Sequence, residues 1–182
     1  MLTLAPKKLA LGFSLIELII AIAIVGLVSA IAMPGYATWI KNSRVRTAAE
    51  SIQNGLQTAR AEAVKRNSQI EFKLDPAMNS TWEINLCSVS SAGVRACDTL
   101  LENRRASEGS STAITVVATP SASKSIVFNN LGSVVADSNP FSQLGITLSG
   151  ADRALRVTLG VGGNTRLCDP STSLAASDPR RC

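Results

Sequence analysis

The chain has 182 residues, of which 46% are hydrophobic and only 4% aromatic, and its formal net charge is +5. This length allows one domain with a substantial core and an additional segment. The sequence contains no histidine, which excludes Ser-His-Asp and Cys-His catalysis and histidine-ligated metal sites. Lys7 and Lys8 precede an apolar run and would be lost if the N-terminus is cleaved. The remaining chain has sixteen basic and thirteen acidic residues, and its net charge of +3 is too small to indicate a nucleic-acid partner by itself.

Residues 13–33 form an apolar run with a single carboxylate, Glu17. As a helix these 21 residues would be roughly 31 Å long, close to the hydrocarbon thickness of a bilayer. One interpretation is a secretory signal, in which Ala30 and Ala32 would form the small-x-small cleavage site, although the run is long for such a signal. A plain membrane anchor is a second interpretation, with Glu17 placed near the interface by snorkelling.

The residues around the start of the run favour a third interpretation. In chain order they are basic, small, aromatic, acidic and finally proline: Lys7, Lys8, Gly12, Phe13, Glu17 and Pro34. This string resembles the leader and N-terminal helix of type IV pilins and of the pseudopilins of type II secretion. The resemblance implies a prepilin leader over residues 1–12, cleavage between Gly12 and Phe13 by a membrane-embedded prepilin peptidase, and methylation of the new amine of Phe13.

The same resemblance implies that Glu17 neutralises the N-terminal amine of a neighbouring subunit during docking into the fibre. Physical chemistry gives a reason for the charge, because a lone carboxylate in a bilayer costs on the order of 3 kcal/mol. A partner amine would remove that penalty, so the charge would favour the docked state. The topology signal is mixed, because Lys41, Arg44 and Arg46 follow the apolar run although Lys7 and Lys8 precede it.

A second helical segment is predicted over residues 34–67. Its apolar residues recur at spacings of three and four, which is typical of a helix that packs against a core: Val45, Ala49, Ile52, Leu56, Ala59 and Ala63. Pro34 is expected to kink one long helix, whose first half is the transmembrane residues 13–33, since helical patterning lies on both sides of it. The helix should end near residues 66–68.

The remaining residues, 68–182, carry strand signals separated by Gly, Ser and Asn. The predicted strands cover residues 68–74, 81–87, 113–118, 125–129, 132–136, 144–150, 154–160 and 165–168. Residues 104–111 and 119–124 are expected to be exposed loops. A helix followed by short strands indicates an α+β domain with antiparallel sheets.

Four cysteines, Cys87, Cys97, Cys168 and Cys182, allow three pairings. We expect Cys87–Cys97 and Cys168–Cys182, because each pair closes a short loop. Four free thiols in a cytosolic protein are the alternative, and the apolar N-terminal segment argues against it, because it would export the domain to an oxidising compartment. No metal site and no cofactor are expected.

The C-terminal part narrows the resemblance to the GspH/FimT group of minor pilins and pseudopilins. This likeness rests on residues 52–72 and 162–182, and it implies two small β-sheets packed against the helix. Some FimT-type members bind DNA during natural transformation through a G-R-x-R motif. Here the matching residues are 163–166, where only the second arginine is present, so a basic DNA-binding patch is a weaker expectation: Arg166, Arg180, Arg181, Arg153 and Arg156.

Residues 160–166 contain closely spaced glycines but no following helix and no Lys-Ser/Thr, so they indicate a hairpin turn and not a phosphate loop. Together, these features predict a non-enzymatic minor pilin or pseudopilin that initiates or caps a type IV pilus or a type II secretion pseudopilus. Its expected partners are other pilins, prepilin peptidase and the inner-membrane assembly platform. Its expected location is the inner membrane, as a single-pass protein with a periplasmic domain, and later the fibre or its tip. The alternative function is DNA uptake.

Overall fold

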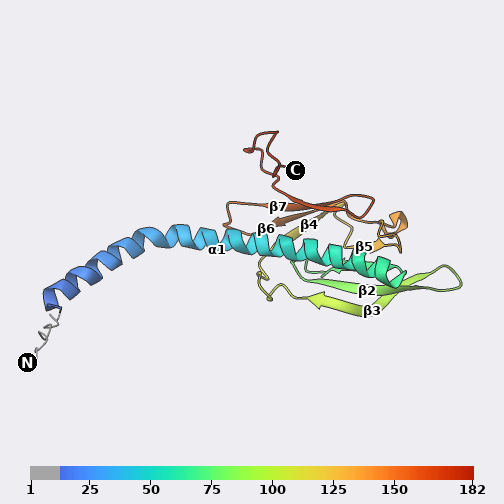
Figure 1. The fold of residues 1–182 in the computed structure, drawn as a ribbon, viewed down its shortest axis with the longest axis horizontal. Helices are drawn as coiled ribbons and strands as arrows, with labels where there is room; N and C mark the ends of the chain where they lie inside the picture. Colours follow the sequence, from blue (N-terminus) through green and yellow to red (C-terminus); the bar gives the residue numbers. More distant parts are fainter. Residues whose placement is uncertain (1–12) are drawn as a thin grey trace, which may run out of the picture. The chain divides into compact units, whose positions relative to one another are not determined.

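The computed structural model describes residues 13–182, excluding the side chains of residues 32–34, so Gly12 and the leader predicted over residues 1–12 lie outside the described part. The chain divides into two compact units between Ala37 and Thr38. One helix, α1 (Leu15–Arg66), belongs to both units, and Figure 1 shows that all the strands follow it.

Helix α1 begins and ends with capping residues that the sequence supplies. Ser14 is the N-cap, because its hydroxyl oxygen accepts the backbone N–H of Glu17 at 3.3 Å. At the other end Asn67 adopts a left-handed φ of 51°, and the N–H of Ser68 donates to the carbonyl of Ala63 at 3.2 Å. This is a Schellman motif, and it confirms the predicted end of the helix. The helix bends between Ile31 and Gly35, the stretch that contains Pro34.

The eight strands form two antiparallel sheets of four strands each. The first sheet has the order β3-β2-β1-β5, with β1 (Ile70–Leu74), β2 (Trp82–Val89), β3 (Arg95–Arg104) and β5 (Ser125–Phe128). The second has the order β4-β6-β7-β8, with β4 (Thr115–Thr119), β6 (Gln143–Thr147), β7 (Leu155–Leu159) and β8 (Thr165–Cys168). The α+β class with antiparallel sheets packed on the helix is therefore confirmed.

The core lies between the second half of α1 and both sheets. All six residues of the predicted helical stripe are fully buried, and Ala48 joins them. In the view of Figure 1, β6 and β7 lie on one side of this half of the helix, and β2 and β3 lie on the other. The buried indole of Trp82 donates to the hydroxyl of Ser51 at 3.0 Å, which ties β2 to the helix and satisfies both polar groups.

Two strand predictions differ from the structure. Strand β3 was not predicted, because its sequence is rich in charge and most of its side chains are exposed, so it lacks an apolar alternation. Residues 132–136, predicted as a strand, contain only a bridge from Val134 to Phe128 and lead into the short 3-10 helix η1 (Ala136–Ser138). The reason is local, because Gly132 turns the chain with a φ of 77° and Asn129 accepts two backbone N–H groups of this turn.

Candidate functional site

The first candidate site is the N-terminal part of α1, whose apolar side chains contact almost nothing. Every large apolar side chain from Phe13 to Ile31 is exposed, with fractions from 48% for Ile19 to 87% for Phe13. A helix that is apolar on every side is suited to lipid or to packing among other helices. No single helix of the described residues is long and apolar enough to be a candidate membrane span, whereas the pair Leu15–Ile31 and Gly35–Arg66 together meets those criteria by length and composition.

Glu17 lies in the first turn of this helix. Its backbone N–H is bonded to Ser14, but its carboxylate forms no ion pair with any residue of the described part of the chain. A carboxylate in the first turn interacts favourably with the helix dipole, which accounts for only a fraction of the cost of placing it in lipid. The structure thus leaves Glu17 exposed, with apolar neighbours and an available charge.

The second candidate site is the C-terminal loop, where the predicted basic residues have structural roles. Arg166 of β8 donates from Nη2 to the carbonyls of Pro179 and Arg181, at 2.8 and 2.9 Å. Arg180 forms an ion pair with Asp178 at 2.7 Å, and together with the backbone N–H of Arg180 it lowers the pKa of Asp178 to about 2. The Arg181 guanidinium donates to the carbonyl of Leu174. These contacts hold the loop closed over β8.

The loop is also closed by the disulfide Cys168–Cys182, and a second disulfide, Cys87–Cys97, joins β2 to β3. Both are the pairs expected from the spacing of the cysteines. Closing the 14-residue separation of the first pair stabilises the fold by about 3 kcal/mol in the chain-entropy picture. Arg153 and Arg156, the other two residues of the predicted patch, lie before and within β7, and neither side chain forms an ion pair with a described residue.

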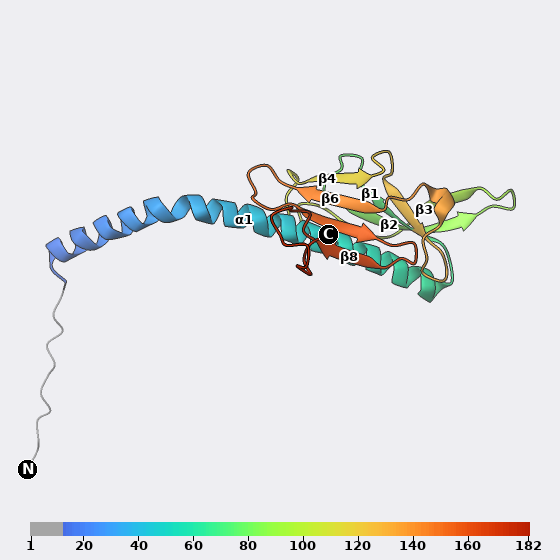
Figure 2. The ribbon, with the colours of Figure 1, turned by 90° about the horizontal axis from the view of Figure 1, so that it is seen from above.

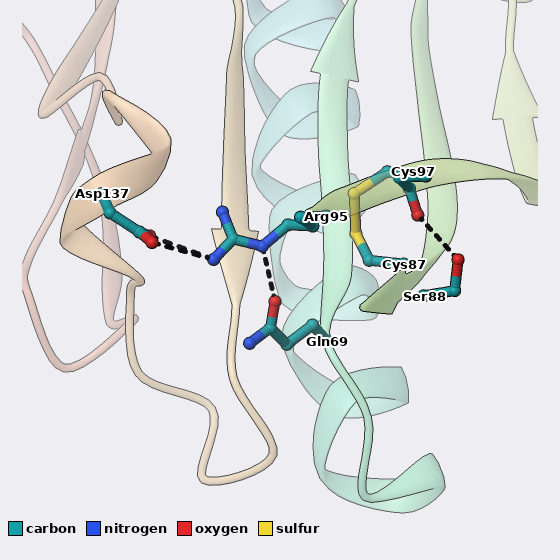
Figure 3. The surroundings of a disulfide bond; sticks show 7 residues. Gln69, Cys87, Ser88, Arg95, Cys97 and Asp137 are labelled. Carbon is teal, nitrogen blue, oxygen red and sulfur yellow. Dashed lines mark hydrogen bonds and ion pairs between the residues drawn. A yellow bond between two sulfur atoms is a disulfide. The ribbon is translucent and has the colours of Figure 1, made fainter. Parts of the chain in front are cut away.

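The disulfide between β2 and β3 lies beside a long-range polar bridge that sequence reasoning missed. Figure 3 shows Arg95, two residues before Cys97, reaching toward Gln69 and Asp137. Its guanidinium donates to Gln69 at 2.6 Å and to both carboxylate oxygens of Asp137, at 3.0 and 3.2 Å. No local signal in the sequence predicts this contact, because the partners are 26 and 42 residues away.

A groove of about 770 Å³ lies where α1 enters the domain. Its walls come from the helix, from the residues around β7 and from the C-terminal loop, and they include Trp39, Arg46, Arg153, Asp169 and Arg180. In the view from above in Figure 2, the C-terminal loop lies over this part of the helix. The described residues contain no group of three or more Cys, Asp or Glu side chains that would hold a metal ion.

Comparisons with known proteins give matches to both the N-terminal segment and the globular domain of the chain. The family described as Type II transport protein GspH matches residues 48–163, and the Prokaryotic N-terminal methylation motif matches residues 7–33. The type IV minor pilin FimU of Pseudomonas aeruginosa PAO1, in two crystal forms, has 20% identity and TM-scores of 0.51 and 0.53. These matches cover 72% and 73% of this chain and 97% and 92% of FimU, and at this identity they show a shared fold.

The minor pseudopilin EpsH of the Vibrio cholerae type 2 secretion system is a more distant structural match. It has 17% identity and a TM-score of 0.46 over 70% of this chain and 98% of EpsH.

Proposed function

The chain belongs to the GspH family of type II transport proteins, and we propose that it initiates or caps the assembly of a pilus or pseudopilus. Its family makes it a minor pilin or pseudopilin of a type II secretion or type IV pilus system, a structural protein and not an enzyme. It assembles with other pilins and is processed by prepilin peptidase, and its N-terminal motif agrees with an inner-membrane anchor. Cleavage between Gly12 and Phe13, a single-pass topology with a periplasmic domain, contact with the assembly platform and a place at the fibre tip belong to the proposal.

The available carboxylate of Glu17 supports the assembly part of this proposal, the docking of the subunit among other pilins. It has no ion-pair partner among the described residues, and the exposed apolar side chains around it suit lipid or the helices of other subunits. In lipid the charge is costly, and the N-terminal amine of a neighbouring subunit would neutralise it. The charge therefore favours subunits that dock at one register along the helix over subunits that remain alone in the membrane.

Replacing Glu17 tests the proposal without disturbing the globular domain. We expect Glu17→Val to insert into the membrane at least as well as the wild type and to be absent from sheared fibres or from cross-linked complexes with other pilins. Glu17→Gln, which has the same shape without the charge, should fail in the same way. Glu62→Val provides a control because it removes an acid of the same helix outside the apolar run, and it should assemble. Normal incorporation of Glu17→Val would refute the assigned role.

DNA binding by a C-terminal basic patch remains the alternative function predicted from the sequence. The guanidinium of Arg166 is occupied by two carbonyls, and Arg180 is neutralised by Asp178. These contacts therefore favour the assembly function, because the arginines hold the C-terminal loop in place. A low-salt gel shift of the full chain in detergent, compared with Arg166→Ala/Arg180→Ala/Arg181→Ala, distinguishes the two functions.

A further inference from the structure

The C-terminal loop, residues 169–182, occupies the guanidinium of Arg166. Leu167 packs against the core, so Arg166, the residue before it on β8, points to the opposite face of the sheet. Its Nη2 donates to the carbonyls of Pro179 and Arg181, at 2.8 and 2.9 Å. While the loop is closed, this nitrogen is therefore withheld from any other acceptor.

The closed loop depends strongly on its disulfide, because it has no anchor in the core. None of the loop residues, all of which the structure describes, is buried. Two backbone hydrogen bonds join its ends, from Asp169 N–H to the carbonyl of Arg180 at 2.7 Å and from Cys182 N–H to the carbonyl of Asp169 at 3.1 Å. Each such bond, like those of Arg166, favours the closed form by only about two- to tenfold. The disulfide to Cys168 contributes on the order of a hundredfold in the chain-entropy picture.

The two disulfides differ in how the rest of the fold holds their cysteines. Cys87 and Cys97 are directly opposite each other in the ladder of β2 and β3, which pairs residues on both sides of them. These strands would keep the two thiols together after reduction, so the bond would re-form readily. Cys168 belongs to β8, whereas Cys182 is an exposed residue of the loop, which would carry it away. Because thiols at a lower effective concentration are more easily kept reduced, Cys168–Cys182 is the more sensitive bond.

We propose that Cys168–Cys182 is a redox-sensitive latch, whose reduction by a dithiol opens the loop and frees the guanidinium of Arg166. One thiolate of the dithiol attacks Sγ of Cys182, the S–S bond breaks, and Cys168 leaves as a thiolate that takes up a proton. The second thiol then attacks the mixed disulfide and releases Cys182, which is protonated in turn. The reductant is oxidised to its own disulfide, and two electrons pass to the protein.

The latch goes beyond the assembly function and does not depend on the role of Glu17. It makes the availability of Arg166 a property of the redox state of the domain. In the oxidised form the arginine fastens the loop, and in the reduced form its planar set of donors becomes available to another acceptor. The structure described above is the oxidised, closed form.

Graded reduction of the full-length chain in detergent micelles tests which bond opens first. The chain is equilibrated with a series of ratios of reduced to oxidised dithiothreitol, then quenched with acid and alkylated with N-ethylmaleimide in denaturant. Peptide mass spectrometry gives the reduced fraction of each cysteine pair. We expect Cys168 and Cys182 to be half reduced at a ratio about tenfold or more below that for Cys87 and Cys97. Equal midpoints or the reverse order would overturn the proposal.

Phenylglyoxal, which condenses with both Nη atoms of an arginine, tests whether opening frees Arg166. Its modification rate should rise on the order of tenfold once Cys168–Cys182 is reduced, because two hydrogen bonds of Nη2 are lost. Arg105 is exposed and its side chain forms no hydrogen bond with a described residue, so it should react at the same rate in both forms. An unchanged rate at Arg166 after reduction would show that the loop stays closed without the bond, and the latch would be refuted.

A double variant separates loss of the bond from any other effect of the reductant. In Cys168→Ser/Cys182→Ser the loop is open without dithiothreitol, so Arg166 should react at the fast rate. Cys87→Ser/Cys97→Ser is the matched control, because it removes the other bond and should leave Arg166 at the slow rate. A slow rate in the first variant or a fast rate in the control contradicts the latch. If either variant fails to fold, the rates of the wild-type chain before and after reduction decide the question.

Discussion

Arg166 and Arg181 are linked through the backbone, because the guanidinium of Arg166 donates to the carbonyl of Arg181 at 2.9 Å. This contact brings two residues of the predicted DNA-binding patch into one structural unit. Next to it the chain forms a parallel bridge between Asp169 and Arg181, and the Cys168–Cys182 disulfide lies beside that bridge. The C-terminal loop is therefore a braced part of the domain.

Removing the Arg166 side chain should loosen this loop. Arg166→Ala loses two charge-assisted hydrogen bonds at an exposed site, so we expect the bridging amides of Asp169 and Cys182 to exchange on the order of tenfold faster with solvent. Hydrogen exchange read by mass spectrometry measures this. Arg156→Ala serves as the control, because the Arg156 side chain forms no hydrogen bond with any described residue. Unchanged exchange in Arg166→Ala would show that the disulfide alone holds the loop.

The carboxyl group of Asp178 should titrate well below its ordinary range. The guanidinium and then the backbone N–H of Arg180 hold its pKa at about 2, compared with 3.8 for a free group. The folded loop therefore binds fewer protons than the unfolded chain between these values. Its stabilisation is present above pH 3.8 and is lost as the pH falls through about 2.

Carbon-13 NMR of the Asp178 carboxyl measures this midpoint directly. Arg180→Gln should raise it toward 3.8, while Arg153→Gln, which removes a cation that forms no ion pair with Asp178, should leave it in place. A wild-type midpoint near 3.8 would be inconsistent with the ion pair.

Gly55 of α1 lies in close contact with the aromatic core. A Cβ at this position would come within 2.8 Å of Phe72 and 2.9 Å of Trp82, both of which are buried. Alanine gains about 1 kcal/mol of helix propensity, but overpacking a close-packed core costs about 1–3 kcal/mol. Gly55→Ala should therefore lower the free energy of unfolding by about 1 kcal/mol.

Thermal unfolding of the full chain in detergent, followed by circular dichroism, checks this sign. Gly35→Ala is the matched control, since among the described residues other than its chain neighbours no side chain lies within 4 Å of the point where its Cβ would be, and it should unfold no earlier than the wild type. If Gly55→Ala were more stable than the wild type, the rings of Phe72 and Trp82 would leave room for the added methyl group, contrary to the structure.

The sequence predicted those parts of the fold that depend on local periodicity. The helical stripe from Val45 to Ala63, the alternation of Ile70, Phe72 and Leu74, and the strand at residues 165–168 all follow from residues close in sequence. Strand β3 was missed because it is held by β2 and the Cys87–Cys97 disulfide while its own side chains are mostly exposed.

The candidate sites divide in the same way. Glu17 stands out in the sequence because a charge in an apolar run is rare, so its position alone identifies it. The contacts of Arg166 and Arg95, and the groove that joins Trp39 to Arg153, depend on segments that only the tertiary fold brings together.

The assembly role of Glu17 is tested most directly by zero-length carbodiimide cross-linking of assembled fibres, followed by mass spectrometry. This reagent joins a carboxylate to an amine in contact with it. We predict a cross-linked peptide pair in which Glu17 of one subunit is bonded to the N-methylated amine of a neighbouring pilin, and a mature form of this chain that begins at Phe13. Fibres that contain this chain without such a link to Glu17, or a mature chain that begins at another residue, would contradict the account.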